Sequence, residues 1–546
     1  MPIIGAEAAA ASALTFFAAA IASAYIADSA GLPILPAAVL VIAAAAAKGV
    51  LTPLQRAARR DRGAAALFAA IAIVAFASLL WRARPDFLPT GSGPDLVHHL
   101  ALIGYIEQHW QLVHDVRLSE YLGEMIDYTP GIHLLAALAG RWLGIDGLHA
   151  VFGVVAATVA LKAGLVFLIA RRFLPDERSR DAFAAAAVLL LLVPYRYSIG
   201  SFTEQSYYAQ VASELFALGM WWTIVVWDEA PWDGAAPLFA LFGVAAFLVW
   251  PVWIGPLFVA LAVVALLHRE RPARDRIVHL AIAAAPVLAI AAVHAARHPG
   301  GFRMVGTGGF AIWPTPAEVG WWFYALAAPA VVFAAARRRT LAILVLLLAI
   351  ALQAAALTLT ARASGAAAPY LALKMFYLAI YPMAIAMAVL LSAIWAAATM
   401  NMRRMRSPRV AWAIVALIAI AAMRRDIAMP KPPPVVSEDV LVAGEWARRL
   451  APPACIDYLT RDGYTAYWLH LAVFGQPRAS GRAMNDETFE PRKALVRWIL
   501  PGSLPYAITD DFDALPRDVR GNVDVVERFG RAAVVRRRGS AAAPCP

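Results

Sequence analysis

Residues 64–81 read AAALFAAIAIVAFASLLW, an apolar stretch without a single charged side chain. An arginine-containing segment, Arg56 to Arg62, precedes it, and Arg82 follows it directly. A stretch of this length and composition is typical of a helix that crosses a bilayer, with its charged flanks at the two membrane surfaces.

The rest of the chain repeats this pattern. Of its 546 residues 61% are hydrophobic and only 16% are charged, a composition that excludes a soluble enzyme. The apolar runs are too long for the strands of a closed barrel. The sequence therefore predicts an all-α polytopic membrane protein with about thirteen spans, at 8–27, 34–50, 64–81, 147–170, 181–198, 207–227, 235–250, 251–268, 277–296, 317–336, 340–360, 371–397 and 409–423.

The basic clusters predict the orientation of these spans. With thirteen spans all of the clusters fall on one side, which the positive-inside rule makes the cytoplasm. The N-terminus is then cytoplasmic, and the chain is expected in a bacterial-type inner membrane. A short apolar segment, 131–143, is expected to lie along the outer surface rather than to span. The clusters are Arg56 to Arg62, Arg171 to Arg180, His268 to Arg276, Arg337 to Arg339 and Arg403 to Arg409.

Two domains are expected. Residues 1–423 form the membrane domain, with a large first outer loop at 82–146, and residues 424–546 form a proline-rich linker and a small extracytoplasmic domain. Short apolar runs at Tyr506 to Thr509 and Ala532 to Val535 predict strands, so this domain is expected to be α/β. The two cysteines, Cys455 and Cys545, are either bridged or two free thiols.

The net charge of +11 arises mostly from arginines beside apolar runs. Such arginines are topology signals, so nucleic acid is not an expected partner. Two cysteines are also too few for a cysteine-based metal cluster.

The first outer loop carries the most polar segment near the membrane. Pro94 and Asp95 suit a helix start, and Asp95, His98 and His99 would then share one helix face. That arrangement could serve as a general base or as a metal site. The alternative is that Asp95 only caps the helix, beside solvated histidines.

This loop resembles that of the GT-C superfamily of membrane glycosyltransferases. Asp95-x-x-His98-His99 is followed by Tyr128-x-Pro130-Gly131-x-His133, which is similar to the bacterial pattern of an Asp before a Tyr-Pro-Pro-Gly-like turn. Thr129 stands where that pattern has its second proline. The resemblance covers roughly residues 64–270 and implies a GT-C-like fold, with Tyr128 and His133 as substrate-binding residues.

The next outer loop places Glu204 where the family often has a second acidic motif, which implies a catalytic role. Its alternative role is a solvated charge at a helix start. The neighbouring Tyr207 and Tyr208 are expected in an interfacial aromatic belt.

Farther on, Arg362, Tyr370 and Lys374 lie at the expected outer boundary of two spans. The stretch resembles the Tyr-x-x-x-Lys segment of arabinofuranosyltransferase-like members, which implies that these residues bind a lipid-linked phosphate. The alternative is a lysine that extends to the headgroups. Lys162 and Glu214 fall inside expected spans and are candidates to pair with each other.

The resemblance implies an inverting-type glycosyltransferase that moves a sugar from a polyprenyl-phosphate donor to a glycan, lipid or protein acceptor at the outer face. Asp95 would be the base, and His98 or His99 would either orient the acceptor or bind a divalent cation, which is the one candidate cofactor. Membrane lipids are the remaining partner. The rival hypothesis is a transporter or flippase of a lipid-linked glycan.

Overall fold

The computed structural model consists of two compact units. The first comprises Met1–Arg82, Thr129–Leu135 and Val154–Lys431, and the second comprises Ala83–Tyr128, Ala136–Gly153 and Pro432–Pro546. The residues that the structure describes are 3–85, 87–90, 94–114, 122–175, 177–230, 232, 234–300, 311–399, 408–427, 436–450, 456–460 and 505–539.

Eight helices of the described residues are long and apolar enough to cross a membrane, so the chain is a multi-pass membrane protein. Each coincides with an expected span. They are α1 (Gly5–Ser29), α2 (Pro36–Ala57), α3 (Arg62–Ala83), α7 (Gly147–Phe173), α10 (Tyr208–Glu229), α13 (Ala273–Arg297), α16 (Leu341–Ala363) and α17 (Tyr370–Ala398).

Four further expected spans coincide with shorter helices, and the segment 131–143 forms a helix of its own. The shorter helices are α4 (Pro94–His109), α6 (Gly131–Leu143), α8 (Arg180–Leu190), α11 (Ala235–Val249), α12 (Ile254–Leu267), α15 (Trp321–Ala335) and α18 (Pro408–Ile427). Single turns lie between them: η2 (Gly123–Ile126), η3 (Tyr195–Tyr197), α9 (Gly200–Thr203), η4 (Pro251–Trp253), α14 (Pro316–Val319) and η6 (Arg338–Thr340).

The span expected at 181–198 is not one continuous helix. Helix α8 ends at Leu190, and turns lead through Pro194 to η3. A proline disfavours helical conformation in the residue before it, which accounts for the interruption. The Ser198 hydroxyl donates to the carbonyl oxygen of Leu191 at 2.7 Å, so the broken helix end keeps a partner inside the bundle.

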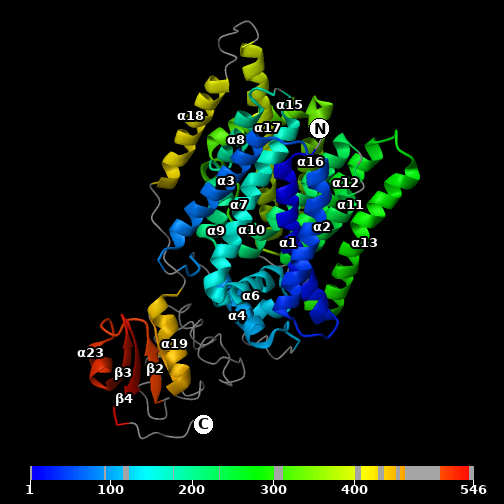
Figure 1. The fold of residues 1–546 in the computed structure, drawn as a ribbon. Helices are drawn as coiled ribbons and strands as arrows, with labels where there is room; N and C mark the ends of the chain where they lie inside the picture. The colour runs from blue at the N-terminus through cyan, green and yellow to red at the C-terminus, as the bar shows by residue number, and fades with distance from the viewer. Residues whose placement is uncertain are drawn as a thin grey trace. The chain divides into compact units, whose positions relative to one another are not determined.

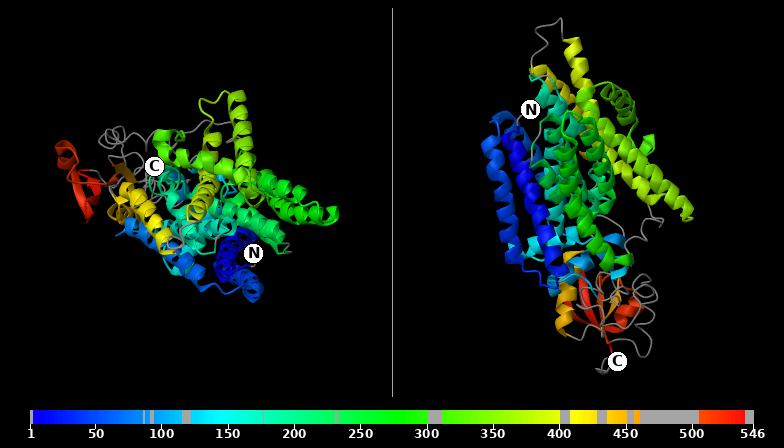
Figure 2. Two further views of the ribbon diagram at one scale, coloured as in Figure 1. Left: turned by 90° about the horizontal axis from the view of Figure 1, so that it is seen from above. Right: turned by 90° about the vertical axis from the view of Figure 1, so that its right-hand side faces the viewer.

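The first unit is a helical bundle in which α1 packs on α2, α10 on α11, and α16 on α17. The views in Figure 1 and Figure 2 show α1 and α2 side by side along the bundle. Helix α7 approaches α3 closely at Gly164, where an added Cβ would lie 2.5 Å from the Phe68 ring. A glycine is therefore needed for these two helices to pack at this distance.

Ion pairs join the helix ends on the side of the arginine clusters. Arg172, at the end of α7, binds Glu7 of α1 at 2.5 Å and Glu229 of α10 at 2.7 Å. Both Arg172 and Glu7 are only 3% exposed, and Trp222 donates to Glu7 as well. The buried charges are therefore paired, as burial in a bundle demands.

A second set of ion pairs lies on the same side. Arg171 binds Asp61, before α3, and Asp181, at the start of α8. Arg339 donates to the carbonyl oxygen of Arg172 at 2.9 Å. These contacts bring together connections that the sequence placed on one membrane face; that this face is cytoplasmic remains a prediction.

The opposite helix ends make their own contacts. Arg82, at the end of α3, donates to the Tyr195 hydroxyl at 3.1 Å, and Arg297, at the end of α13, lies 3.8 Å from Asp28 of α1. All four residues belong to ends or connections expected to face outward. The predicted alternation of helix directions agrees with this grouping.

The second unit contains a four-stranded sheet in the order β1-β2-β4-β3. Strands β1 and β2 are parallel, and the other two pairings are antiparallel. Helix α19 packs on the sheet. The strands predicted at Tyr506 to Thr509 and Ala532 to Val535 are confirmed. The elements are α19 (Glu438–Leu450), β1 (Ile456–Leu459), β2 (Tyr506–Thr509), α23 (Arg517–Gly521), β3 (Val523–Phe529) and β4 (Ala532–Arg537).

The small domain has an apolar core that includes Leu459, Val519, Val523 and Val535, all at most 3% exposed. Buried residues of β1, β3 and β4 supply this core together with Val519 of α23. The predicted α/β class of the domain is thus confirmed. Cys455, Cys545 and the prolines of the linker lie outside the described residues.

Candidate functional site

The expected helix start in the first outer loop is present. Helix α4 begins at Pro94, so Asp95, His98 and His99 occupy its first two turns with the spacing that places them on one face. The side chain of Asp95 lies outside the described residues. His98 is half-buried and His99 is 6% exposed, so His99 is not a solvated histidine.

The two parts of the first-loop pattern meet at His99 and Tyr128. Their rings lie 5.4 Å apart between centroids in an edge-to-face arrangement. Tyr128 is 9% exposed and η2 leads into it. Residues 29 positions apart in sequence are thus in contact, which the pattern alone did not require.

Contacts with α11 account for Thr129, which stands where the resembled pattern has proline, and for Gly131, which matches that pattern. The Thr129 hydroxyl donates to the carbonyl oxygen of Val249, at the end of α11, at 3.2 Å, a bond that proline could not make. A Cβ at Gly131 would lie 2.7 Å from the Leu248 carbonyl oxygen. The turn therefore needs a small residue here to approach α11, and it starts α6, on which His133 is fully buried.

A carboxyl group of α4 caps the start of α7. Glu107 Oε1 accepts a hydrogen bond from the backbone N–H of Gly147 at 2.6 Å. Burial, together with the negative charge of the neighbouring Asp146, raises the pKa of Glu107 to about 7 against the lowering effect of that bond. This titratable group in the first outer loop was not among the expected site residues.

In the first unit, Lys374 is enclosed by tyrosine rings. Its Nζ lies 2.9 Å from the ring centroid of Tyr207 and 5.1 Å from those of Tyr370 and Tyr377. The side chain is 1% exposed, so it does not extend to the headgroups as the alternative required. Tyr207 packs beneath this cation instead of joining an interfacial belt. Cation–π contacts of this kind hold a charge in a desolvated site.

Further residues complete this tyrosine cage, defined here as Tyr207, Tyr370 and Tyr377 around Lys374. The Tyr377 hydroxyl donates to Gln205 Oε1 at 3.1 Å. Glu204 directly precedes Gln205, follows the single turn α9 and is half-buried. Glu204 is therefore next to the cage along the chain, and it is not a fully solvated charge.

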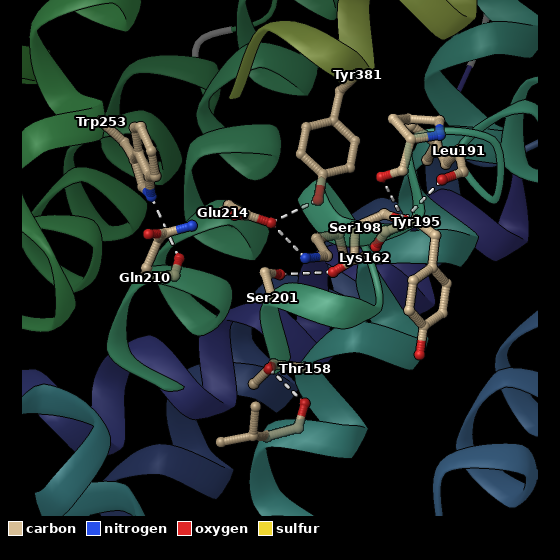
Figure 3. Close-up of polar contacts among 12 residues, drawn as sticks. Thr158, Lys162, Leu191, Tyr195, Ser198, Ser201, Gln210, Glu214, Trp253 and Tyr381 are labelled. Atoms are coloured by element: carbon tan, nitrogen blue, oxygen red, sulfur yellow. Dashed lines mark hydrogen bonds and ion pairs between the residues drawn. The ribbon is translucent and has the colours of Figure 1, made fainter. Parts of the chain in front are cut away.

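A second polar cluster lies deeper along α17, and Figure 3 shows it. Lys162 Nζ and the Tyr381 hydroxyl each donate to Glu214 Oε2 at 2.5 Å. Glu214 is fully buried and Lys162 is 5% exposed, so the predicted pairing of these two charges is confirmed. The cluster joins α7, α10 and α17.

The cage and this cluster form one stripe on α17. Tyr370, Lys374, Tyr377 and Tyr381 follow the spacing i, i+4, i+7 and i+11, which puts them on one helix face. Tyr381 lies seven positions after Lys374, which corresponds to a rise of about 10 Å along the helix. The sequence pattern indicated Tyr370 and Lys374 as candidate site residues, but not Tyr381 or Gln205. The helical spacing from Lys374 could have identified Tyr381.

The remaining expected residue, Arg362, lies in the last turn of α16 and is exposed. Expected site residues thus occur in both units: Asp95, His98, His99 and Tyr128 in the second, and His133, Glu204, Arg362, Tyr370 and Lys374 in the first.

In the part of the chain that the structure describes, no group of three or more His, Cys, Asp or Glu could hold a metal ion.

No protein-family model matches the chain, and no curated protein matches it. Among solved structures it is similar to the oligosaccharyltransferase of Archaeoglobus fulgidus in the apo form, with a TM-score of 0.46 and 13% identity over 83% of this chain and 70% of that chain. It is also similar to oligosaccharyltransferase AglB of that organism in complex with an inhibitory peptide and a dolichol-phosphate, with a TM-score of 0.38 and 13% identity over 82% and 69% of the two chains.

Both neighbours are oligosaccharyltransferases. At TM-scores below 0.5 the likeness carries no argument about the family, substrates or mechanism of this chain.

Proposed function

We propose that this protein is a membrane glycosyltransferase that moves a sugar from a polyprenyl-phosphate donor to an acceptor at the outer face. The observation that carries the proposal is the environment of Lys374, a cation near the N-terminal end of α17 that is 1% exposed and is surrounded by tyrosine rings. Charged side chains inside a membrane bundle are costly and usually functional.

Lys374 has the chemistry that a phosphate leaving group needs. When the bond between the sugar and the phosphate breaks, negative charge develops on the phosphate oxygens, and a nearby ammonium stabilises it. The hydroxyl groups of Tyr207 and Tyr370 can donate hydrogen bonds to the phosphate, whereas that of Tyr377 donates to Gln205. For a phosphate to reach Nζ, the Tyr207 ring must move aside, so donor binding would open the cage.

The acceptor side of the reaction is assigned to the first outer loop. Asp95 would take the proton of the acceptor hydroxyl or amide as that group attacks the anomeric carbon, a role worth about 10² to 10⁴ in rate. His98 and His99 would orient the acceptor, with Tyr128 fixing the His99 ring. A divalent cation at the same histidines is a further proposal. Glu204 is the second acidic candidate.

A transfer assay in proteoliposomes tests the assignment of Lys374. With a radiolabelled sugar on polyprenyl phosphate as donor, Lys374→Met is expected to reduce turnover at least 100-fold, because removing a charge-stabilising group costs about 10² or more. Lys374→Arg keeps the charge and should retain part of the activity. Lys48→Met, an exposed lysine on α2, is the matched control. Equal turnover by the Met variant and the wild type would refute the role of Lys374.

One observation favours the rival hypothesis of a transporter or flippase. The buried pair of Lys162 and Glu214 crosses from α7 to α10 inside the bundle, and such pairs also occur on transport pathways. A glycosyltransferase releases free polyprenyl phosphate only when acceptor is present. Movement of the intact lipid-linked glycan across the vesicle, without that release, would support the rival.

A further inference from the structure

A cleft opens on the arginine-cluster side of the first unit, far along the helices from the tyrosine cage. Its volume is about 530 Å³. One wall is the end of α2, including Gly49, Pro53 and Ala57, and the other includes Val226 of α10 and Leu238 of α11. Every residue that lines it is apolar or glycine. The proposed glycosyl transfer uses none of these residues.

We propose that this cleft binds an acyl chain of an anionic phospholipid from the surrounding bilayer. Helix α2 is apolar, and only 17% of its apolar stretch is buried against the rest of the protein. Its surroundings in the membrane are therefore lipid. A cleft lined mostly by apolar atoms beside such a helix offers water few hydrogen-bond partners, whereas an acyl chain fills it favourably.

Charge complementarity specifies the headgroup. Arg56 lies in the last turn of α2, next to Ala57 of the cleft wall, and Arg60 follows four residues after Arg56. Both arginines are exposed. Arginines that directly flank an apolar segment lie at headgroup level, where they attract anionic lipids. Each such arginine is worth about 1 kcal/mol, which corresponds to about a fivefold change in affinity.

The chain offers a variant that adds bulk at the cleft wall. Gly49 lines the cleft, and an added Cβ there meets no atom within 4 Å, so the helix accommodates Gly49→Leu without a clash at the Cβ. The change also removes a glycine from a helix, which favours folding. Ala44→Leu is the matched control, because Ala44 is exposed on the same helix but does not line the cleft.

Native mass spectrometry of the full chain, released from detergent after titration with phosphatidylglycerol or with phosphatidylcholine of identical acyl chains, tests the proposal. The wild type and Ala44→Leu are expected to retain one phosphatidylglycerol tightly, and Gly49→Leu to bind it at least tenfold more weakly. Changing Arg56 and Arg60 to glutamine should cut the preference for phosphatidylglycerol about 25-fold while phosphatidylcholine binding is unchanged.

Three results would overturn the proposal: equal affinity for the two lipids in the wild type, unchanged retention by Gly49→Leu, or displacement of the lipid by polyprenyl phosphate at equal concentration. None of these measurements depends on transferase activity, so this proposal and the proposed function can fail separately. Correct folding of each variant is checked by its elution as a single species in size-exclusion chromatography.

Discussion

Replacing Lys162 by methionine removes the cation that faces Glu214 inside the bundle. The carboxylate is fully buried, and its Oε2 atom accepts from Lys162 and Tyr381 at 2.5 Å each. Removing one partner of a buried ion pair costs about 3–5 kcal/mol, because the other charge stays buried. The Tyr381 hydroxyl still donates to the carboxylate. We therefore expect the lower end of that range, about 3 kcal/mol, for the loss in free energy of unfolding.

The matched comparison replaces the whole cluster. Lys162→Met, Glu214→Leu and Tyr381→Phe together leave no buried charge or orphaned hydroxyl, so the triple variant is expected within about 1 kcal/mol of the wild type or above it. Unfolding is measured by denaturant titration in detergent micelles, with Lys48→Met as an exposed control expected within about 0.5 kcal/mol. A cost below about 1 kcal/mol for Lys162→Met alone would show that Glu214 needs no counter-charge, and the reasoning would fail.

Three further predictions concern the first outer loop and the topology. Asp95→Asn is expected to abolish transfer while expression and membrane insertion persist, because basicity is lost and shape is kept; near-normal turnover would remove Asp95 as the base. A reporter fused after Ala428 should be outside and one after Arg406 inside, and finding both on one side would remove the last span. Because the pKa of Glu107 is raised to about 7, the unfolded chain loses this proton at lower pH than the folded one. Stability should therefore fall as pH rises from about 4.5 to about 7 and stay level above, and Glu107→Gln should remove that slope in thermal unfolding.

The sequence predicted best the helices that cross the lipid bilayer. A span such as α3 must be apolar over its whole length, so its composition alone identifies it. The pairing of Lys162 with Glu214 was predictable for the same reason, since charges inside a bundle need partners. The span at 181–198 was predicted less well, because hydropathy does not register the interruption at Pro194.

For the candidate site as well, some features follow from the sequence and others only from the tertiary structure. The sequence by itself determined that the chain crosses the membrane many times and that a small α/β domain follows, and it predicts that the arginine-containing connections share one face. Only the tertiary structure decided that Tyr207 lies under Lys374, that Gln205 binds Tyr377, and that His99 meets Tyr128. Hydropathy specifies which segments enter the lipid, whereas the rotation and depth of each helix, and so its contacts with distant segments, are set by packing against its neighbours.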